Sequence, residues 1–504
     1  MTALSLSRML GTAFIATLLF CTATARAETP GGGEIVLTGT LTRADHRGYQ
    51  ALRFTVPPGA RGLSIALNYQ RGVPWAAIDM ALYDPLRFRG ASGFAKTRIF
   101  VGEVNATPSY LPGPLPPGEW TLVLGGANAP EGRETPYEAR IRIETDPNAG
   151  AALFAGVIRD EAGWYRGDFH THTGHSDGVC AASSGKRVPC PVYRTLETAE
   201  ARGLDFIAVS DHNTISHLES LSELLPAFDT LAIIPAQEVT TYSGHLNVYG
   251  LTLPIDFRLG TDYMPSVVAM SEAVARLGGA IAINHPGISL TEGCPGCGWS
   301  AETVDYDAID AIEIVNGTIA RWSGGPEGMG TSIPFWFARL NEGHRVTAIG
   351  GSDNHDGRDT TDILSTIGRP ASVVYAEALS GPAILEGMRK GRVFIDLEGV
   401  KERRFILTAS SGRQKAQMGD VMTPRRGASI RFLIQAEKVP AGSRLEIWRD
   451  GQVLETEASG PALSGDAMRP FTWIADGKPH WFAAALRASD GRLLLIANPI
   501  YVRP

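Results

Sequence analysis

The feature that most constrains the fold is a long alternation of short apolar runs and helix-like stretches between residues 162 and 396. The apolar runs include "DFIAVSDH", "LAIIPAQE", "AIAINHPG" and "VTAIGGSDNH", and they are separated by longer stretches such as "SVVAMSEAVARLGG". Several helix-like stretches end in glycine, which adopts the left-handed conformation that terminates a helix. This alternation predicts an α/β domain of barrel-like (β/α) architecture over residues 160–398.

The sequence on both sides of this region alternates with a period of two instead. Residues 28–150 contain runs such as "YQALRFTV" and "EWTLVLGG" divided by Gly and Pro clusters, which predicts an N-terminal β-sandwich followed by a linker near residues 145–151. Residues 400–504 contain "RFILTASS" and "ASIRFLIQA", with two Asp-Gly turns between apolar runs. We therefore expect a second, C-terminal β-sandwich.

The first 27 residues have the pattern of a signal peptide. Arg8 precedes an apolar run that ends at Phe20, and Ala25-Arg26-Ala27 is a small-residue cleavage site. The run is too short to span a bilayer comfortably, and bulky Phe20 before Cys21 disfavours a lipoprotein. We expect an exported protein, periplasmic or secreted, whose mature chain has no transmembrane segment.

The net charge and the cysteine content indicate which partners and which covalent links to expect. The whole chain has a formal charge of −7 and no basic run, so no nucleic-acid partner is expected. Four cysteines follow the signal peptide, and an even number in an oxidising compartment favours disulfides, by proximity Cys180–Cys190 and Cys294–Cys297. A structural zinc held by the four thiolates is the alternative.

The stretch "GDFHTHTGHSDG", residues 167–178, concentrates three of the 11 histidines of the chain. His170 and His172 are two residues apart at the end of an expected strand, so both imidazoles point to the same side and could reach one ion. A His-x-His pair alone is a weak signal, because such pairs also arise by chance. His175 lies off the strand, and a role in orienting a ligand is an open alternative for it.

Residues with metal-binding side chains recur at the carboxyl ends of the later strands, which converge on one face of a β/α barrel. Singly, each has a simpler explanation, such as a buried core histidine, a turn Asp or a helix cap. Together they predict a site for two or three metal ions, since a single ion takes four to six ligands. The nine candidates are His170, His172, Asp177, His212, Glu238, His245, His285, Asp353 and His355. The histidines without this placement are interpreted as structural or surface residues, namely His46, His217, His344 and His480.

Five segments in order resemble the motifs of the PHP (polymerase and histidinol phosphatase) domain family: "HTHTGHSDG", "DFIAVSDHN", "QEVTTYSGHLNVYG", "NHPG" and "GGSDNH". The resemblance covers residues 165–396. The form of the third motif and the flanking β domains are most similar to the exported branch that includes carbaryl hydrolase-like enzymes. The resemblance implies a distorted (β/α)7 barrel with up to three metals, flanked here by N-terminal and C-terminal β-sandwich domains.

The family pattern also implies how the ligands are shared among the ions. The first ion would take His170, His172, Glu238 and Asp353; the second would share Glu238 and add His285, with His245 matching less securely; the third would take Asp177, His212 and His355. Imidazole and carboxylate ligands suit zinc, manganese or iron, and the sequence does not separate these metals.

Metal-bridged hydroxide is the nucleophile expected from such a site. Asp353 could accept a proton, Asp211 could orient a ligand or the bound water, and Arg358 could pair with a phosphate, although a solvated Arg358 fits equally well. Asn316, after another expected strand, could line the pocket.

The leading hypothesis is a metal-dependent phosphoesterase that acts on small phosphomonoesters or phosphodiesters. Hydrolysis of a carboxylic or carbamic ester is the alternative, since residues 317–337 offer both Arg321 and aromatic side chains. A third hypothesis is a non-catalytic metal-binding or interaction protein. An amidohydrolase, which also begins with His-x-His, fits the later motifs poorly. The oligomeric state is not predicted.

Overall fold

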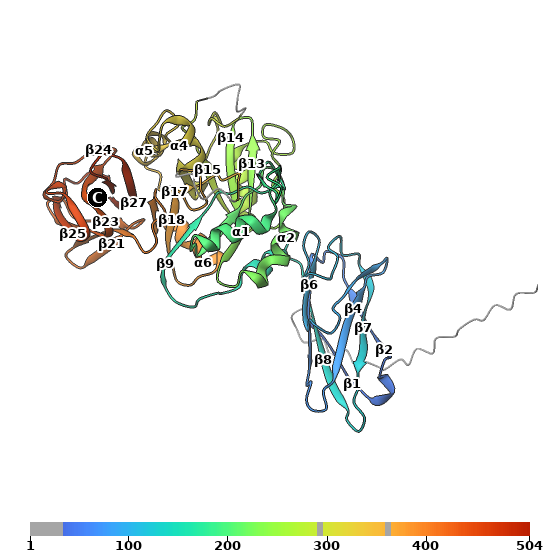
Figure 1. Ribbon diagram of the computed structural model, residues 1–504. Coiled ribbons are helices and arrows are strands. Elements are labelled where there is room, and N and C mark those ends of the chain that lie inside the picture. The colour runs from blue at the N-terminus through green and yellow to red at the C-terminus, as the bar shows by residue number, and fades with distance from the viewer. Residues whose placement is uncertain (1–33, 290–295, 358–363, 504) are drawn as a thin grey trace, which may run out of the picture. The chain divides into compact units, whose positions relative to one another are not determined.

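The computed structural model describes residues 34–289, 296–357 and 364–503, and the chain forms two compact units (Figure 1). The first unit contains the described residues up to Val101 together with Ser109–Thr145, and the second contains Gly102–Pro108 and the residues from Asp146 onward. None of the helices in these ranges is long and apolar enough to cross a membrane.

The N-terminal unit consists of antiparallel strands in two four-stranded sheets, as its period of two predicts. One sheet has the order β1 (Glu34–Leu41), β8 (Thr135–Glu144), β3 (Gly62–Tyr69) and β6 (Arg98–Gly102). The other has the order β2 (Tyr49–Val56), β7 (Gly118–Asn128), β4 (Ala77–Tyr83) and β5 (Phe88–Ala91). Alternate residues are buried, among them Leu52, Phe54 and Trp120.

The second unit begins with the alternation of strands and helices that the sequence predicts. Its strands are β9 (Gly163–Asp168), β12 (Phe206–Val209), β13 (Ala232–Thr241), β14 (Gly244–Tyr249), β15 (Ala280–Asn284), β16 (Ala311–Asn316), β17 (Thr347–Gly351), β18 (Ala371–Ala376) and β19 (Val393–Asp396). The helices between them are α1 (Val192–Ala201), α2 (His217–Leu224), α3 (Val267–Arg276), α4 (Gly317–Ser323), α5 (Ile333–Asn341) and α6 (Gly381–Arg389). Strands β9, β12 and β13 run parallel, as do β15, β16 and β17.

Three features depart from a simple strand–helix alternation, and one of them is β18, which runs antiparallel to both β9 and β19. Strand β14 runs antiparallel to both β13 and β15, because only Tyr242 and Ser243 separate β13 from β14 and so short a link allows only a hairpin. A second small hairpin, β10 (Val179–Ala181) with β11 (Arg187–Pro189), precedes α1.

The C-terminal strands continue the same hydrogen-bonded network. They are β20 (Arg404–Ser411), β21 (Gln414–Gln417), β22 (Val421–Met422), β23 (Ser429–Arg449), β24 (Gln452–Val453), β25 (Leu463–Ile474), β26 (His480–Arg487) and β27 (Leu493–Val502). Strand β27 pairs with β19, so one large mixed sheet includes the strands of both regions. The barrel, the separate C-terminal sandwich and the boundary near residue 399 therefore stay predictions.

The turns and the core follow from local sequence. Asp450 and Gly451 both have positive φ in the turn between β23 and β24, as the Asp-Gly hairpin signal predicts. Trp336 of α5 is fully buried, donates from its indole nitrogen to the carbonyl oxygen of Val346, and packs against Trp481 of β26. The core beside the α/β strands is thus continuous with side chains of the C-terminal strands β23, β26 and β27.

We expect Trp336→Ala to lower the free energy of unfolding of the second unit by about 3–5 kcal/mol, because it leaves a cavity at this junction. Trp322→Ala is the matched control, since that side chain is 71% exposed, and it should change stability by less than about 0.5 kcal/mol. Urea titration followed by far-UV circular dichroism measures both. Equal midpoints for the two variants would contradict the assignment of Trp336 to the core.

Candidate metal centre

The two histidines of the His-x-His pair lie just beyond the end of β9, where a second segment pairs with them. The amide of His172 donates to the carbonyl of Asn354, and the amide of Asp353 donates to the carbonyl of His170. Asp168 is fully buried and its carboxylate accepts the amides of His170, Ser352 and Gly368. The ends of β9 and β17 are therefore fixed to each other, which brings residues from opposite ends of the α/β region together.

The first cluster comprises His170, His172, Glu238 and Asp353, all buried. Oε2 of Glu238 lies 3.3 Å from Nε2 of His170 and 3.4 Å from Nε2 of His172. Oδ1 of Asp353 lies 2.9 Å from Nε2 of His172 and 3.4 Å from Nε2 of His170. Four donor atoms thus face one small volume, as expected for a set of ligands to one ion.

The second cluster uses the other oxygen of Glu238. Its Oε1 lies 3.2 Å from Nδ1 of His245 and 3.6 Å from Nε2 of His285. In the hairpin, His245 is opposite Thr240, and in the next strand it is opposite Asn284, whose amide donates to Oε1 of Glu238. The hairpin therefore returns His245 to Glu238, although only six residues separate the two in the chain.

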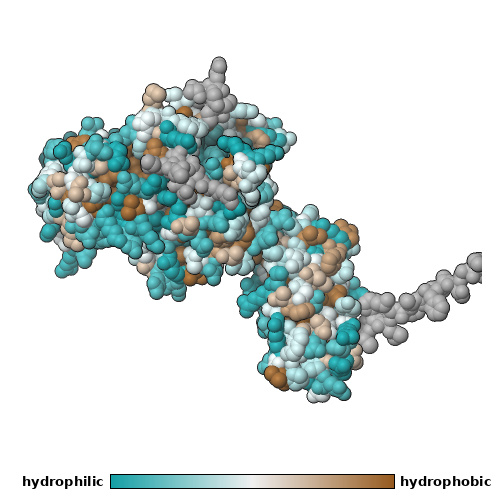
Figure 2. Space-filling model, viewed as in Figure 1, coloured by the Kyte–Doolittle hydropathy of each residue, from teal (hydrophilic) through white to brown (hydrophobic). Residues whose placement is uncertain are grey.

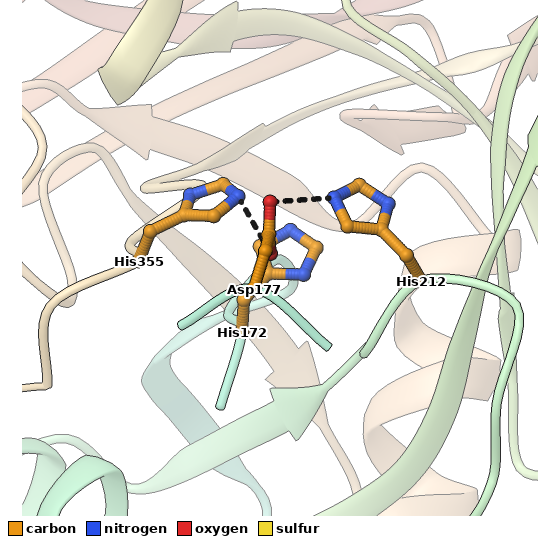
Figure 3. Close-up of side chains that lie close together, drawn as sticks. All are labelled: His172, Asp177, His212 and His355. Carbon is orange, nitrogen blue, oxygen red and sulfur yellow. Dashed lines mark ion pairs between the residues drawn. The ribbon is translucent and has the colours of Figure 1, made fainter. Parts of the chain in front are cut away.

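The third cluster contains His172, Asp177, His212 and His355 (Figure 3). Asp177 extends between two imidazoles: Oδ1 lies 3.3 Å from Nε2 of His355, and Oδ2 lies 3.7 Å from Nε2 of His212. The ring of His172 stacks between those of His212 and His355, with centroid distances of 4.4 and 4.2 Å. His172 thus adjoins two clusters, and this one is more exposed than the others.

Several buried atoms of these clusters have no hydrogen-bond partner in the protein. They are Nε2 of His170, Nδ1 of His172, Oε2 of Glu238 and both ring nitrogens of His245. Buried polar atoms are normally hydrogen-bonded, and leaving one unsatisfied costs about 1–3 kcal/mol. Divalent cations would satisfy lone pairs of this kind, so the buried His, Glu and Asp clusters fit several metal ions.

The charges of the clusters are strongly coupled. Burial alone would raise the pKa of Glu238, but His170, His212 and His245 hold it well below its usual value. Burial, together with His355 and His212, lowers the pKa of His172 to about 4. Burial would also lower the pKa of His355, yet Asp353 and Asp177 raise it to about 9. The site thus collects carboxylates that stay ionised alongside histidines in both protonation states.

Glu313 contacts the ring nitrogen of His170 that does not face Glu238, and this supporting role was not predicted from the sequence. The carboxylate is 1% exposed, and its Oε1 lies 3.0 Å from Nδ1 of His170. Its Oε2 accepts from the amide of His285 and from the side chain of Asn316, which also donates to Asp353. A lone acid in the apolar run "AIEIVN" was the signal available in the sequence.

Asp211 and His217 anchor the turn that carries Asp177. Asp211 accepts hydrogen bonds from the amide and the hydroxyl of Thr173 and from the hydroxyl of Ser176, and it pairs with His217 at 3.2 Å. Burial would raise its pKa, but the hydrogen bond and charge of His217 hold it far below the usual value. Asp211 thus fixes this turn in place, and its predicted catalytic role stays a prediction.

The other predicted residues lie away from the clusters or outside the described ranges. His175 is exposed, with Nδ1 2.8 Å from the hydroxyl of Ser216. His46, His344 and His480 belong to none of the three clusters found in the described ranges. Arg358 lies outside the described residues, so its pairing with phosphate stays a prediction.

The predicted Cys180–Cys190 disulfide is wrong, because both cysteines are buried free thiols. In the β10–β11 hairpin Cys180 is opposite Val188, yet its thiol contacts that of Cys190, so the two cysteines adjoin as their spacing predicts but no bond joins them. Burial raises the pKa of Cys190 to about 12. The Cys294–Cys297 pairing stays a prediction, since Cys294 lies outside the described residues.

Comparison with known proteins gives only loose likenesses. No family model matches the chain, and no curated protein matches it. A two-domain protein from Bacteroides vulgatus, described as containing a predicted PHP-like metal-dependent phosphoesterase, is 18% identical over 68% of this chain and 98% of its own length, with a TM-score of 0.36. PsfC from Pseudomonas syringae is 17% identical over 44% of this chain and 87% of its own length, with a TM-score of 0.28. These values assign neither a family nor an activity.

Glu238→Gln should remove more metal than Asp177→Asn. Glu238 faces two clusters with different oxygens, whereas Asp177 belongs to one, so we expect the first variant to lose at least two ions and the second to lose one. Elemental analysis of the purified proteins gives the metal content, and circular dichroism verifies folding. Equal metal content in the two variants would contradict the shared role of Glu238.

Metal affinity should rise with pH up to about 9. His355 binds a metal only as neutral imidazole, but with its pKa at about 9 it is protonated at neutral pH in the metal-free protein. The contribution of His355 to metal affinity therefore increases about tenfold for each unit by which the pH rises, up to about pH 9. Competition with a chelator at about pH 6, 7 and 8 measures the slope. His355→Ala should flatten it, and a pH-independent wild type would refute the link.

Proposed function

We propose that the protein is an exported metal-dependent hydrolase of the PHP type, in the carbaryl hydrolase-like branch, with phosphoesterase activity on small phosphomonoesters or phosphodiesters. The observation that carries the proposal is the sharing of Glu238 and His172 among three adjoining ligand clusters. Such sharing is expected of a site for two or three ions close together. The order of the five sequence motifs supports the same family.

The residues that would hold the ions follow from the three clusters. His170, His172, Glu238 and Asp353 would hold one ion, Glu238, His245 and His285 a second, and His172, Asp177, His212 and His355 a third. Bound divalent ions supply Lewis acidity, activate water at neutral pH and neutralise developing negative charge. Zinc, manganese and iron all suit this donor set.

The chain's own residues supply the remaining chemistry. Glu313 fixes the orientation of the His170 ring, and Asp211 fixes the turn that presents Asp177. The side chain of Asn316 directs hydrogen bonds to both Glu313 and Asp353, which steadies the carboxylate best placed to accept a proton from water. Arg358 would add a fixed cation for the phosphoryl group of the substrate or for the phosphate product.

Hydrolysis of carboxylic or carbamic esters is the second candidate, and one observation favours it. Within the described ranges, the nine ligand residues form ion pairs only with one another and with Glu313, and none of these pairs involves Lys or Arg. Phosphate recognition would then depend on the bound ions and on Arg358, whereas a neutral ester requires no further cation.

Paired assays with p-nitrophenyl phosphate, bis-p-nitrophenyl phosphate and p-nitrophenyl acetate test the proposal. We expect the metal-loaded protein to prefer a phosphate ester and His170→Ala to lose at least about a hundredfold in kcat/KM, the scale on which metal-site residues act. Tyr263→Ala, a change at a 67% exposed side chain outside the ligand clusters, serves as the control. A preference for acetate would select the second candidate, and no turnover by fully loaded protein would favour a non-catalytic role.

A further inference from the structure

The outward face of the sheet β2–β7–β4–β5 in the N-terminal unit is patterned in rows. Register places Tyr49, Gly125 and Asp79 in one row across β2, β7 and β4. Two residues further along lies a row of small side chains, made up of Ala51, Val123, Ala81 and Ala91. A third row contains Arg53, Thr121, Tyr83 and Phe88. The intervening residues Leu52 and Phe54 point inward to the core.

Exposed aromatic rings stand at both ends of this face. Tyr49 is 79% exposed, and the rings of Tyr83 and Phe88 are 43% and 45% exposed with centroids 5.0 Å apart. Monomeric domains seldom leave so many aromatic rings in water without a binding role. Figure 2 shows hydrophobic residues at the surface of this unit, set among hydrophilic ones.

Two loops add rings at the Tyr49 end. Phe94 donates its amide to Oδ1 of Asp79, which places its loop beside the first row. Trp75 is 54% exposed, and its carbonyl accepts from the side chain of Asn128 at the end of β7. The Tyr49 end of the sheet thus has three exposed rings within loops and strands that contact one another.

Between the Tyr49 row and the Tyr83 row, the side chains on this face of the sheet are small. A β-carbon at Gly125 would lie 3.5 Å from Cε1 of Tyr49, so the ring leans across the glycine and presents its other side to solvent. The row that follows has no side chain larger than valine. From the Tyr49 row to the Tyr83 row the strands advance four residues, or about 13 Å. The face is therefore a shallow trough with aromatic ends.

The charges of the trough select against charged polymers. Arg53 and Glu119 pair with each other at 3.2 Å. Oδ1 of Asp79 accepts two amides, and among the described residues nothing donates to its second oxygen. Within the three rows, Asp79 is thus the one charged side chain without an ion pair among the described residues, and it offers an acceptor for hydroxyl groups beside the ring of Tyr49, while Arg71 contacts the neighbouring loop at the carbonyl of Phe94. An anionic polysaccharide would be repelled, and a flat apolar membrane contact would leave this carboxylate buried and unpaired.

We propose that this trough binds a neutral oligosaccharide or polysaccharide segment, with sugar rings stacked on Tyr49 and Tyr83 and hydroxyl groups donating to Asp79. A sugar ring has an apolar C–H face and a polar hydroxyl rim, which matches aromatic platforms separated by a small-residue floor and a free carboxylate oxygen. The N-terminal unit would then hold the hydrolase on a glycan surface. The proposal does not depend on the activity proposed for the metal centre.

Native affinity electrophoresis of the full chain tests this, with β-glucan, galactomannan, xylan or dextran in the gel and polygalacturonate as the anionic comparison. We expect retardation by at least one neutral polymer and none by polygalacturonate. Tyr49→Ala, Trp75→Ala and Asp79→Asn should each weaken it at least about threefold, the scale of one stacked ring or hydrogen bond. Tyr263→Ala, 67% exposed in the second unit, is the matched control and should bind as wild type does.

Several results would each refute glycan binding by the trough. The proposal fails if no neutral polymer retards the wild type, if Tyr49→Ala and Tyr263→Ala behave alike, or if polygalacturonate is preferred. It also fails if analytical ultracentrifugation shows a dimer that Tyr49→Ala abolishes, because the trough is then a contact between copies. Chelator-treated protein should bind the same polymer unchanged, so failure of the hydrolase proposal leaves this result interpretable.

Discussion

The second unit depends above all on the buried carboxylate of Glu238. It is fully enclosed in the second half of β13, beyond the residues of that strand that pair with β12, and its two oxygens face different histidines. An ionised group at this depth requires compensating positive charge, which the surrounding imidazoles supply only in part. The neighbouring strands therefore carry histidines where a typical core would have apolar side chains. The same side chains thus form the candidate metal site and make up part of the core.

Much of the site could be predicted from the sequence, because its ligands follow apolar strands that end at one face. His170, His172, Glu238 and Asp353 lie within about 3.5 Å of one another in the pairs described. His245 seemed insecure because so few residues separate it from Glu238. The antiparallel turn at Tyr242 and Ser243 resolves that difficulty, since the hairpin folds the chain back at once.

What the sequence did not reveal are interactions that depend on three-dimensional register. Glu313 looks like an isolated acid in an apolar strand, and only the pairing of β16 with β17 shows that it supports His170. His217 follows Asp211 by six residues with no periodic signal, and the start of α2 brings them together. The Cys180–Cys190 prediction failed in a different way, because the two thiols do lie together but remain free.

The hairpin that returns His245 has a consequence for how this chain can vary. Successive residues of a strand point to opposite sides, so inserting or deleting one residue between Thr241 and Gly244 would shift the return strand and turn His245 away from Glu238. Turn length there is under functional constraint even though Tyr242 itself is 89% exposed. Natural length variation should therefore accumulate in other surface loops and spare this two-residue connection.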